Sequence, residues 1–376
     1  MKKGGIMIVG LGDLAGWVLE ILARLPGTGR IVAGDINEDW GIRKVNSALI
    51  GASQLNLFPQ IHFRRMDVNN VQEMAAILRE EEPDVIYNST TLQSWWVITQ
   101  LPKPLYQEID EARYGPWFPM HFVLTHKLMM AIKASGLHPL VANAAFPDAV
   151  NPCLAKLGLT PTVGIGNIDN LTPSLRLAVS RKLNVPLSSV TIYLVAPHFF
   201  SYFTSRYGHT AGCPYLLKVT VYDKDVTPQL KGEELFQDLV KYARRPGSLK
   251  AHPVVAASAV KIIRGLFHDT RELGHAPGPN GLPGGYPILI SSSGVEVVLP
   301  EGVTLEEAVR INIQAQKFDG IEEIQEDGTV VITDKSAEIM KRLIGFDCKV
   351  MKVSQMEEKA REMDERFRRY VEKKKA

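Results

Sequence analysis

The stretch that most constrains the fold of this chain is residues 4–16, where a short apolar run leads into a cluster of glycines. Residues 6–9 form a continuous apolar run, the pattern of a strand buried on both faces. Gly10, Gly12 and Gly16 follow, and apolar residues at helical spacing come after them. The glycines therefore lie where a strand turns into a helix, which predicts an α/β fold with a phosphate-binding turn.

This turn has the chemistry of a dinucleotide site. Gly10 permits the tight turn, and Gly12 lets the backbone approach a pyrophosphate at the N-terminus of the helix. Asp13 and Leu14 open that helix and are predicted to contact the same ligand. The next predicted strand ends in Asp35, whose carboxylate would accept bonds from both ribose hydroxyls of NAD and repel the 2′-phosphate of NADP. The sequence therefore favours NAD over NADP.

Strands and helices alternate through residues 1–152, which predicts a doubly wound parallel sheet, a Rossmann domain that binds NAD at the carboxyl ends of its strands. Polar residues that follow two further strands join the predicted cofactor site: Asp67, Ser89 and Thr90. The connection 88–118 is long and rich in Trp and Tyr. It is predicted either as a lid or binding loop, or as a loop whose aromatic side chains pack against a second domain.

Composition limits the classes of function. With 376 residues the chain is long for one core, so two domains are expected. The 43 basic and 41 acidic residues nearly cancel, which gives no argument for a nucleic-acid or membrane partner and leaves a small-molecule substrate. Three widely spaced cysteines form no disulfide or metal framework and suit a reducing cytoplasm, and no apolar stretch is long enough to span a membrane.

Residues 153–376 change character, because helices there are interspersed with antiparallel hairpins. This pattern predicts an α+β substrate and catalytic domain. Its last segment, 354–376, is strongly charged and helix-prone, which predicts a solvated helix, with a subunit contact as the alternative.

Three strand ends in the middle of the chain carry polar residues: residues 141–143 end in Asn143, residues 164–169 end in Asp169, and residues 192–198 end in His198. In order and spacing, these motifs resemble those of the lactate/malate dehydrogenase superfamily, and the resemblance covers most of residues 4–345. Asn151-Pro152 is a second possible register for the asparagine.

The resemblance implies a Rossmann domain followed by a lactate/malate dehydrogenase-like C-terminal domain. It also implies hydride transfer between NAD and a hydroxy or keto substrate. His198 would be the acid/base, and Asp169 would orient its ring and stabilise the imidazolium. Asn143 would fix the carbonyl or the nicotinamide amide. The resemblance further implies a homodimer or homotetramer.

The sequence departs from the family where the substrate carboxylate would bind. The family places an arginine three residues after the aspartate, and here that position is Thr172. Arg113 and Arg176 are weaker candidates for substrate contacts, as is His252, which lies in a segment similar to the last active-site helix of the family. We therefore expect a substrate other than plain lactate or malate, larger and aromatic or cyclic.

Other functions compete with a dehydrogenase. An NAD-dependent glycosidase would need a divalent metal held by cysteine and histidine, and Cys153 has no adjoining histidine. No metal site is predicted, because the spacing of His198, His209 and Cys213 matches no strong ligand pattern. A saccharopine- or opine-dehydrogenase-like reductase and a non-catalytic NAD-binding protein are the remaining alternatives.

Overall fold

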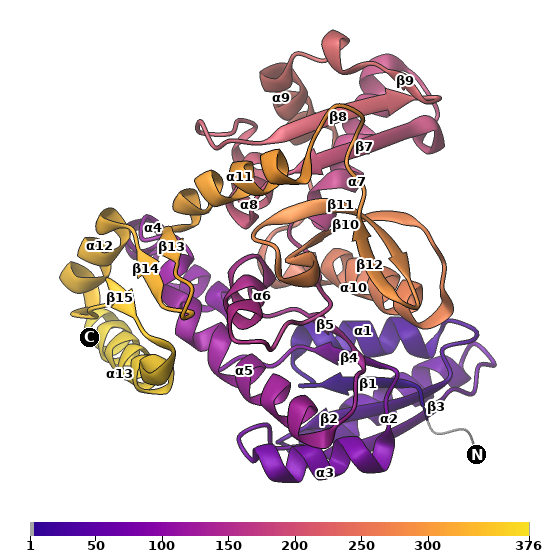
Figure 1. Ribbon diagram of the computed structural model, residues 1–376, viewed down its shortest axis with the longest axis vertical. Helices are drawn as coiled ribbons and strands as arrows, with labels where there is room; N and C mark the ends of the chain where they lie inside the picture. Colours follow the sequence, from indigo (N-terminus) through magenta and orange to yellow (C-terminus); the bar gives the residue numbers. More distant parts are fainter. Residues whose placement is uncertain (1–3, 376) are drawn as a thin grey trace.

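The computed structural model describes residues 4–375, and a six-stranded parallel sheet forms its base (Figure 1). The strand order is β3-β2-β1-β4-β5-β6, the doubly wound order that the alternation of strands and helices predicts. The strands are β1 Ile6–Val9, β2 Arg30–Asp35, β3 Gln60–Arg65, β4 Val85–Asn88, β5 Leu140–Asn143 and β6 Val163–Gly164.

Helices cover both faces of this sheet, so β1 is buried on both sides. Ile6 and Ile8 face a cluster that includes residues of α1 and α10, whereas Met7 and Val9 face a cluster with residues of α3 and α5. This is the reason that β1 is apolar at every position. The helices of this half are α1 Asp13–Ala23, α2 Glu38–Ser53, α3 Val71–Glu81, α5 Phe118–Ser135 and α6 Pro147–Lys156.

The second half builds three small antiparallel sheets among helices, as the sequence pattern predicts. The first sheet comprises β7 Val190–Val195, β8 Leu216–Val221 and β9 Lys224–Asp225; the second comprises β10 Leu273–Pro277, β11 Gly285–Ser291 and β12 Gly294–Val297; the third comprises β13 Ile321–Ile324, β14 Val330–Ile332 and β15 Val350–Met351. The helices are α7 Ile168–Leu183, α8 His198–Tyr207, α9 Gly232–Tyr242, α10 His252–His268, α11 Leu305–Ala315, α12 Asp334–Ile344 and α13 Met356–Lys375.

The two halves share structure across the predicted boundary. β6 belongs to the parallel sheet although it follows residue 152. One hydrophobic cluster joins residues of α3 and α5 to residues of α12 and α13. The division into domains at residue 152 stays a prediction.

The connection between β4 and α5 is folded into short helices: η1 Trp95–Gln100, α4 Lys103–Asp110 and η2 Gly115–Trp117. Its aromatic side chains have different surroundings. Trp117 is fully buried in the core, and the Tyr202 hydroxyl of α8 donates to Asp110 Oδ1 at 2.7 Å. Trp96 instead lines a cleft, which is described below. The packing interpretation holds for Trp117, whose ring meets that of Phe367 in α13, and the lid or binding-loop interpretation stays a prediction.

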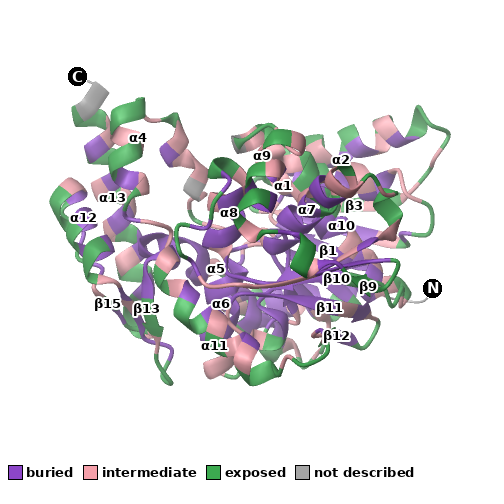
Figure 2. Cartoon of the chain, turned by 90° about the horizontal axis from the view of Figure 1, so that it is seen from above, coloured by how far each residue is buried: buried purple, intermediate pink, exposed green. Residues whose placement is uncertain are grey.

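The charged C-terminal segment is a helix, as predicted, but the prediction that solvent surrounds it is wrong. The buried positions of α13 recur at helical spacing, and the helix packs against α5, where the yellow segment lies in Figure 1. They are Met356, Ala360, Met363, Phe367 and Tyr370. The charged residues occupy the outer face, seen as green on α13 in Figure 2.

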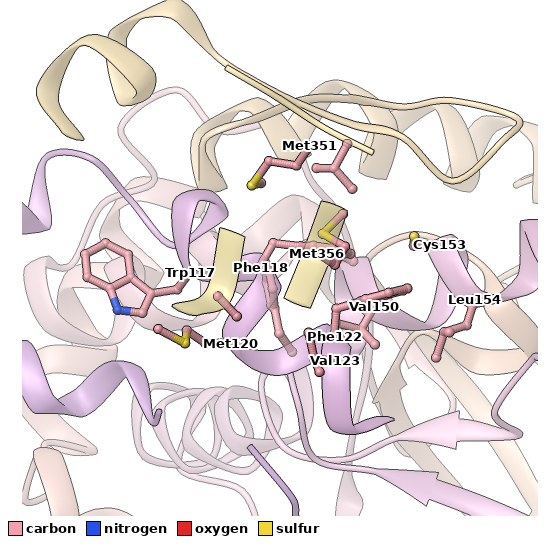
Figure 3. Packing of buried hydrophobic residues seen from close by; sticks show 14 of the residues in the cluster. Trp117, Phe118, Met120, Phe122, Val123, Val150, Cys153, Leu154, Met351 and Met356 are labelled. Atoms are coloured by element: carbon pink, nitrogen blue, oxygen red, sulfur yellow. The ribbon is translucent and has the colours of Figure 1, made fainter. Parts of the chain in front are cut away.

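Figure 3 shows this packing from close by: Met356 of α13 and Met351 of β15 belong to the same hydrophobic cluster as Phe118, Phe122 and Val150. The high charge of this segment masks an apolar stripe at helical spacing, and this stripe is what buries one face of α13.

Candidate functional site

A cleft of about 710 Å³ runs along the carboxyl ends of the parallel strands. Ligands of doubly wound sheets bind at this edge. All eight residues that the sequence predicts for the cofactor line this cleft: Gly10, Gly12, Asp13, Leu14, Asp35, Asp67, Ser89 and Thr90. The structure thus brings together side chains from the ends of β1, β2, β3 and β4.

The glycine turn has the geometry that a close ligand requires. Gly10 has φ +88°, and a Cβ there would lie 3.1 Å from Cγ2 of Thr90 and 3.2 Å from the Ser89 backbone, so only glycine fits without strain. A Cβ on Gly12 would meet nothing within 4 Å, so this position faces open space. Gly12 precedes α1 without a side-chain cap, which leaves the first N–H groups of the helix available to an anion.

Asp35 links the glycine turn to the end of β2. Its Oδ2 accepts the Leu11 N–H at 2.7 Å, and its Oδ1 accepts the Asn37 N–H at 2.9 Å. The Trp40 indole donates to the Leu11 carbonyl at 3.0 Å, so backbone groups on both sides of the turn are held. Each carboxylate oxygen of Asp35 still has a lone pair that can accept from a ribose hydroxyl.

His198 lies at the other end of the cleft, at the start of α8. Its Nδ1 is 2.7 Å from Oδ1 of Asp319, the last residue of η7 Gln316–Asp319, and Oδ2 of the same carboxylate accepts the Phe199 N–H at 2.9 Å. No described residue bonds the other ring nitrogen, Nε2. Burial opposes a charge on the ring, but Asp319, with Asp148 further off, outweighs it, so the pKa of His198 is raised.

Aromatic side chains hold the His198 ring in place. Ring centroids of Tyr114, Phe146 and Tyr202 lie 4.6, 5.6 and 6.2 Å from that of His198. The Tyr114 hydroxyl is 3.0 Å from Nε2 of His121, which also lines the cleft. Burial, aided by His198, lowers the pKa of His121 to about 3, so this imidazole is neutral at ordinary pH.

Asp148 is a second carboxyl group that acts on this end of the cleft. Burial raises its pKa to about 7; the charge of His198 opposes the shift and that of Asp319 adds to it. Asn167 donates to its Oδ2, whereas its Oδ1 is buried and has no hydrogen-bond partner among the described residues. Two carboxyl groups, those of Asp319 and Asp148, therefore act on the charge of His198.

The prediction that Asp169 orients His198 is wrong. Asp169 is buried in the first turn of α7, where its Oδ1 pairs with the Lys261 ammonium of α10 and accepts the His275 N–H at 3.4 Å. The first turn of α7 thus directs this carboxylate toward α10 and β10, and η7 supplies the acid for His198 instead.

Asn143 is also placed differently from the prediction. It is fully buried and does not line the cleft. Its Nδ2 donates to Asn151 Oδ1 at 2.9 Å, and its Oδ1 accepts from Asn88 Nδ2 at 3.0 Å. Asn151, the alternative position, is equally buried and donates to the Gly278 carbonyl at 3.0 Å. Both asparagines therefore tie strand ends together.

Of the three weaker substrate candidates, one lines the cleft and two do not. His252 lines the cleft; burial lowers its pKa, and Asp13 partly offsets this. Arg113 lies outside the lining, donates to the Asp110 carbonyl at 3.3 Å and places its guanidinium over the Phe199 ring. Arg176 is exposed on α7 and is also absent from the lining.

Sequence reasoning missed Asp319 and His121. Asp319 lies 121 residues from its partner and stands before Gly320 in an acidic region, where nothing distinguishes it. His121 had a usable signal, because it lies in the first turn of the long apolar helix that follows the aromatic connection.

Three further observations concern the cysteine, metal and membrane predictions. Cys153 is buried and donates to the Gly328 carbonyl at 3.2 Å, away from the cleft lining. Among the described residues, no three His, Cys, Asp or Glu side chains are grouped so that they could hold a metal ion. Within residues 4–375, no helix combines the length and apolar character that crossing a bilayer requires.

The sheet order and the glycine turn define a doubly wound fold of the dinucleotide-binding type. Over 84–90% of the chain the fold is that of lactate and malate dehydrogenases, as the resemblance in sequence implies. Malate dehydrogenase from Plasmodium falciparum matches with a TM-score of 0.58 and 14% identity, over 90% of this chain and 100% of that one. Lactate dehydrogenase from Eimeria maxima, solved with NADH and oxamate, matches with a TM-score of 0.57 and 14% identity, over 84% of this chain and 92% of that one.

A third similar structure is the lactate dehydrogenase from Cryptosporidium parvum, complexed with lactic acid and NAD. It matches with a TM-score of 0.57 and 16% identity, over 85% of this chain and 99% of that one. No family model and no curated protein sequence matches the chain.

Proposed function

We propose that this protein is an oxidoreductase that transfers a hydride between NAD and a hydroxy or keto substrate that is neither lactate nor malate. One observation carries the proposal: a single cleft contains the glycine turn with Asp35 at one end and His198, bonded to Asp319, at the other. A dinucleotide site beside an acid/base histidine is the arrangement that such a reaction needs. Solved structures of the same fold that contain NADH or NAD support it.

The residues of the cleft fit a dinucleotide. Gly12 and the first N–H groups of α1 would hold the pyrophosphate, since this position is open and uncapped. Asp35 would accept from the ribose hydroxyls, and its charge would repel a 2′-phosphate, which favours NAD over NADP. When bound, the nicotinamide ring supplies the hydride acceptor or donor.

His198 moves the proton in this proposal. Nε2 takes the proton of the substrate hydroxyl during oxidation and returns it during reduction. Asp319 fixes Nδ1 as the donor of the 2.7 Å bond and stabilises the imidazolium that forms. The aromatic rings around His198 exclude water from its faces, and Tyr114 and His121 border the place of the substrate.

The test is calorimetric binding of NAD and NADP to the wild type, Asp35→Asn and Asp39→Asn. Asp35→Asn keeps an acceptor for the Leu11 N–H but removes the charge, so we expect the preference for NAD to fall by about tenfold. Asp39 is an exposed acid of α2 outside the cleft, and its variant should bind as the wild type does. Failure of the wild type to bind either dinucleotide would contradict the proposed function.

We also propose a homodimer or homotetramer, as the resemblance implies, and a cytoplasmic location, as the few and widely spaced cysteines suggest. Light scattering of the purified protein measures the assembly directly.

A further inference from the structure

Two residues that contact α8 have backbone conformations that side chains rarely adopt. Phe146 has φ +42° and ψ +57°, and Asn167 has φ +49° and ψ −110°, outside the left-handed helical region. Glycine would relieve the strain at either position, so the side chains that stand there have a use that offsets it. For Phe146 this use is contact with His198, since the ring centroids of the two lie 5.6 Å apart.

The use of the Asn167 side chain is visible in its bonds. Its amide donates to Oδ2 of Asp148, and its backbone carbonyl accepts from the Ser201 hydroxyl at 2.6 Å. Ser201 lies three residues after His198 on α8. Asn167 therefore joins the Asp148 carboxyl group to the helix that begins with His198.

The turn that carries Asp148 is fixed on several sides. A Cβ on Gly164 would collide with Cβ of Pro147, and a Cβ on Gly278 would collide with the Pro147 carbonyl oxygen, so both neighbours approach more closely than a side chain would allow. The Asp148 carbonyl accepts the Gly284 N–H at 3.2 Å. Backbone packing therefore holds the carboxyl group in its place.

The Asp148 carboxyl group is buried, and only one of its oxygens is hydrogen-bonded. The residue is 7% exposed, and Oδ1 has no partner among the described residues. An ionised carboxyl group in such a place is costly unless a positive charge lies near it. His198 supplies this charge, since it acts on Asp148, and Asp148 in turn joins Asp319 in raising the pKa of His198 against the effect of burial.

The remaining ionisable groups that act on Asp148 or lie against the His198 ring come from five elements. They are Asp319 of η7, His121 of α5, Tyr202 of α8, Tyr286 of β11 and Tyr114 of the connection between β4 and α5. Burial lowers the pKa of His121 to about 3 and raises the pKa of each tyrosine, so these four groups are neutral at ordinary pH. The charge at this end of the cleft is therefore shared among His198, Asp319 and Asp148.

We propose that Asp148 is a positioning residue of the acid/base, a second carboxyl group that acts through His198 and changes its charge in step with the ring. The inference rests on the proposed function of the cleft. When His198 gives its proton to the substrate oxygen, Asp148 takes up a proton from water, and it releases that proton when the ring is protonated again. The summed charge of Asp148, Asp319 and His198 then stays the same, and two buried carboxylates never face a neutral ring.

The experiment follows the ring nitrogens of His198 by NMR across a pH series of the protein without ligands, and His198→Gln identifies the signal. Asp148→Asn removes the charge at nearly constant shape, and Asp169→Asn is the matched control, a buried acid that pairs with Lys261. We expect the titration midpoint of His198 to fall by at least about half a pH unit in Asp148→Asn and to stay in place in Asp169→Asn.

The same coupling is measured from the other side. Because linkage is reciprocal, His198→Gln should raise the titration midpoint of the Asp148 carboxyl carbon by a similar amount. A carboxyl group that only supports the fold would give no such pair of shifts.

A second variant covers the case in which Asp148→Asn does not fold. Asn167→Gly relieves the backbone strain and removes the donor to Oδ2, so Asp148 is protonated more easily. We expect the midpoint of His198 to fall here too, by less than in Asp148→Asn. If the Asn167 side chain served the fold alone, this midpoint would not move.

The outcomes separate the two proposals. An unchanged midpoint of His198 in Asp148→Asn, or in Asn167→Gly where Asp148→Asn does not fold, overturns this inference and leaves the proposed function standing, because dinucleotide binding is measured separately. Failure of the wild type to bind NAD or NADP overturns the proposed function, and with it the acid/base role that Asp148 would serve.

Discussion

The two ends of the cleft are built in different ways. At the dinucleotide end, the chain presents backbone N–H groups, a glycine with φ +88° and aspartates at strand ends, all from the first 90 residues. At the histidine end, side chains from α5, α8 and η7 meet, and the His198–Asp319 pair spans 121 residues. One end therefore depends on local backbone geometry, whereas the other exists only after distant elements pack together.

The largest effect should come from removing the acid/base at the histidine end. Once a screen of hydroxy and keto compounds has identified a substrate, we expect His198→Ala to lower kcat by about 10²–10⁴-fold, because no side chain then accepts or donates the proton. Affinity for NADH should stay within about threefold, since the glycine turn is untouched. Steady-state kinetics and calorimetry measure both quantities, with His138→Ala as the exposed control. Full turnover in His198→Ala would contradict the assignment of proton transfer to the histidine end of the cleft.

A glycine substitution tests the dinucleotide end, where we expect a loss of affinity for the dinucleotide and not a direct loss of proton transfer. Gly10→Ala and Gly136→Ala both force alanine into positive φ, at +88° and +76°, and each should destabilise the protein by about 1–3 kcal/mol in urea unfolding. Only at Gly10 does the new Cβ contact Thr90 and the Ser89 backbone, so only this variant should lose dinucleotide affinity, by about tenfold or more. Equal loss of affinity in both variants would show that affinity follows overall stability and not the backbone geometry at Gly10.

The smallest effect should be a shift in pH dependence. Oxidation of the alcohol needs neutral Nε2 on His198, so the rate rises as pH passes the pKa of this ring. Asp319 raises that pKa, so Asp319→Asn should lower it and move the rising limb toward lower pH. Asp169→Asn should leave the limb in place, because that carboxylate pairs with Lys261. If Asp169→Asn moved the limb and Asp319→Asn did not, Asp169 would be the partner of His198, as the resemblance in sequence implies. Initial rates across a pH series provide the measurement.

The dinucleotide end was predictable because its signals are local. The glycine turn follows an apolar strand, Asp35 ends β2, and Asp67, Ser89 and Thr90 lie within two residues of the ends of β3 and β4. Parallel strands present their carboxyl ends at one edge of the sheet, so these residues had to gather there. Prediction needed only the position of each strand.

The partner of His198 was not predictable in this way. Asp169 has the spacing that the family pattern suggests, but Lys261 in α10 compensates its charge. Asp319 reaches His198 only through the packing of η7 against α8, which no periodicity in the sequence reports. The buried face of α13 is an intermediate case. The spacing of its apolar residues predicts that one face is buried, but nothing in the sequence says which element covers that face.

The packing of α13 against α5 has a consequence for biosynthesis. Met356, Met363 and Phe367 complete a cluster whose other members include Phe118 and Phe122. On a ribosome, α5 emerges more than 200 residues earlier than α13, and until α13 arrives the part of α5 that packs against it has no cover, although α3 already covers another part. Nascent chains should therefore present a chaperone-binding surface on α5 throughout most of translation, and the nucleotide half should reach full protease resistance only after residues 356–370 have been made.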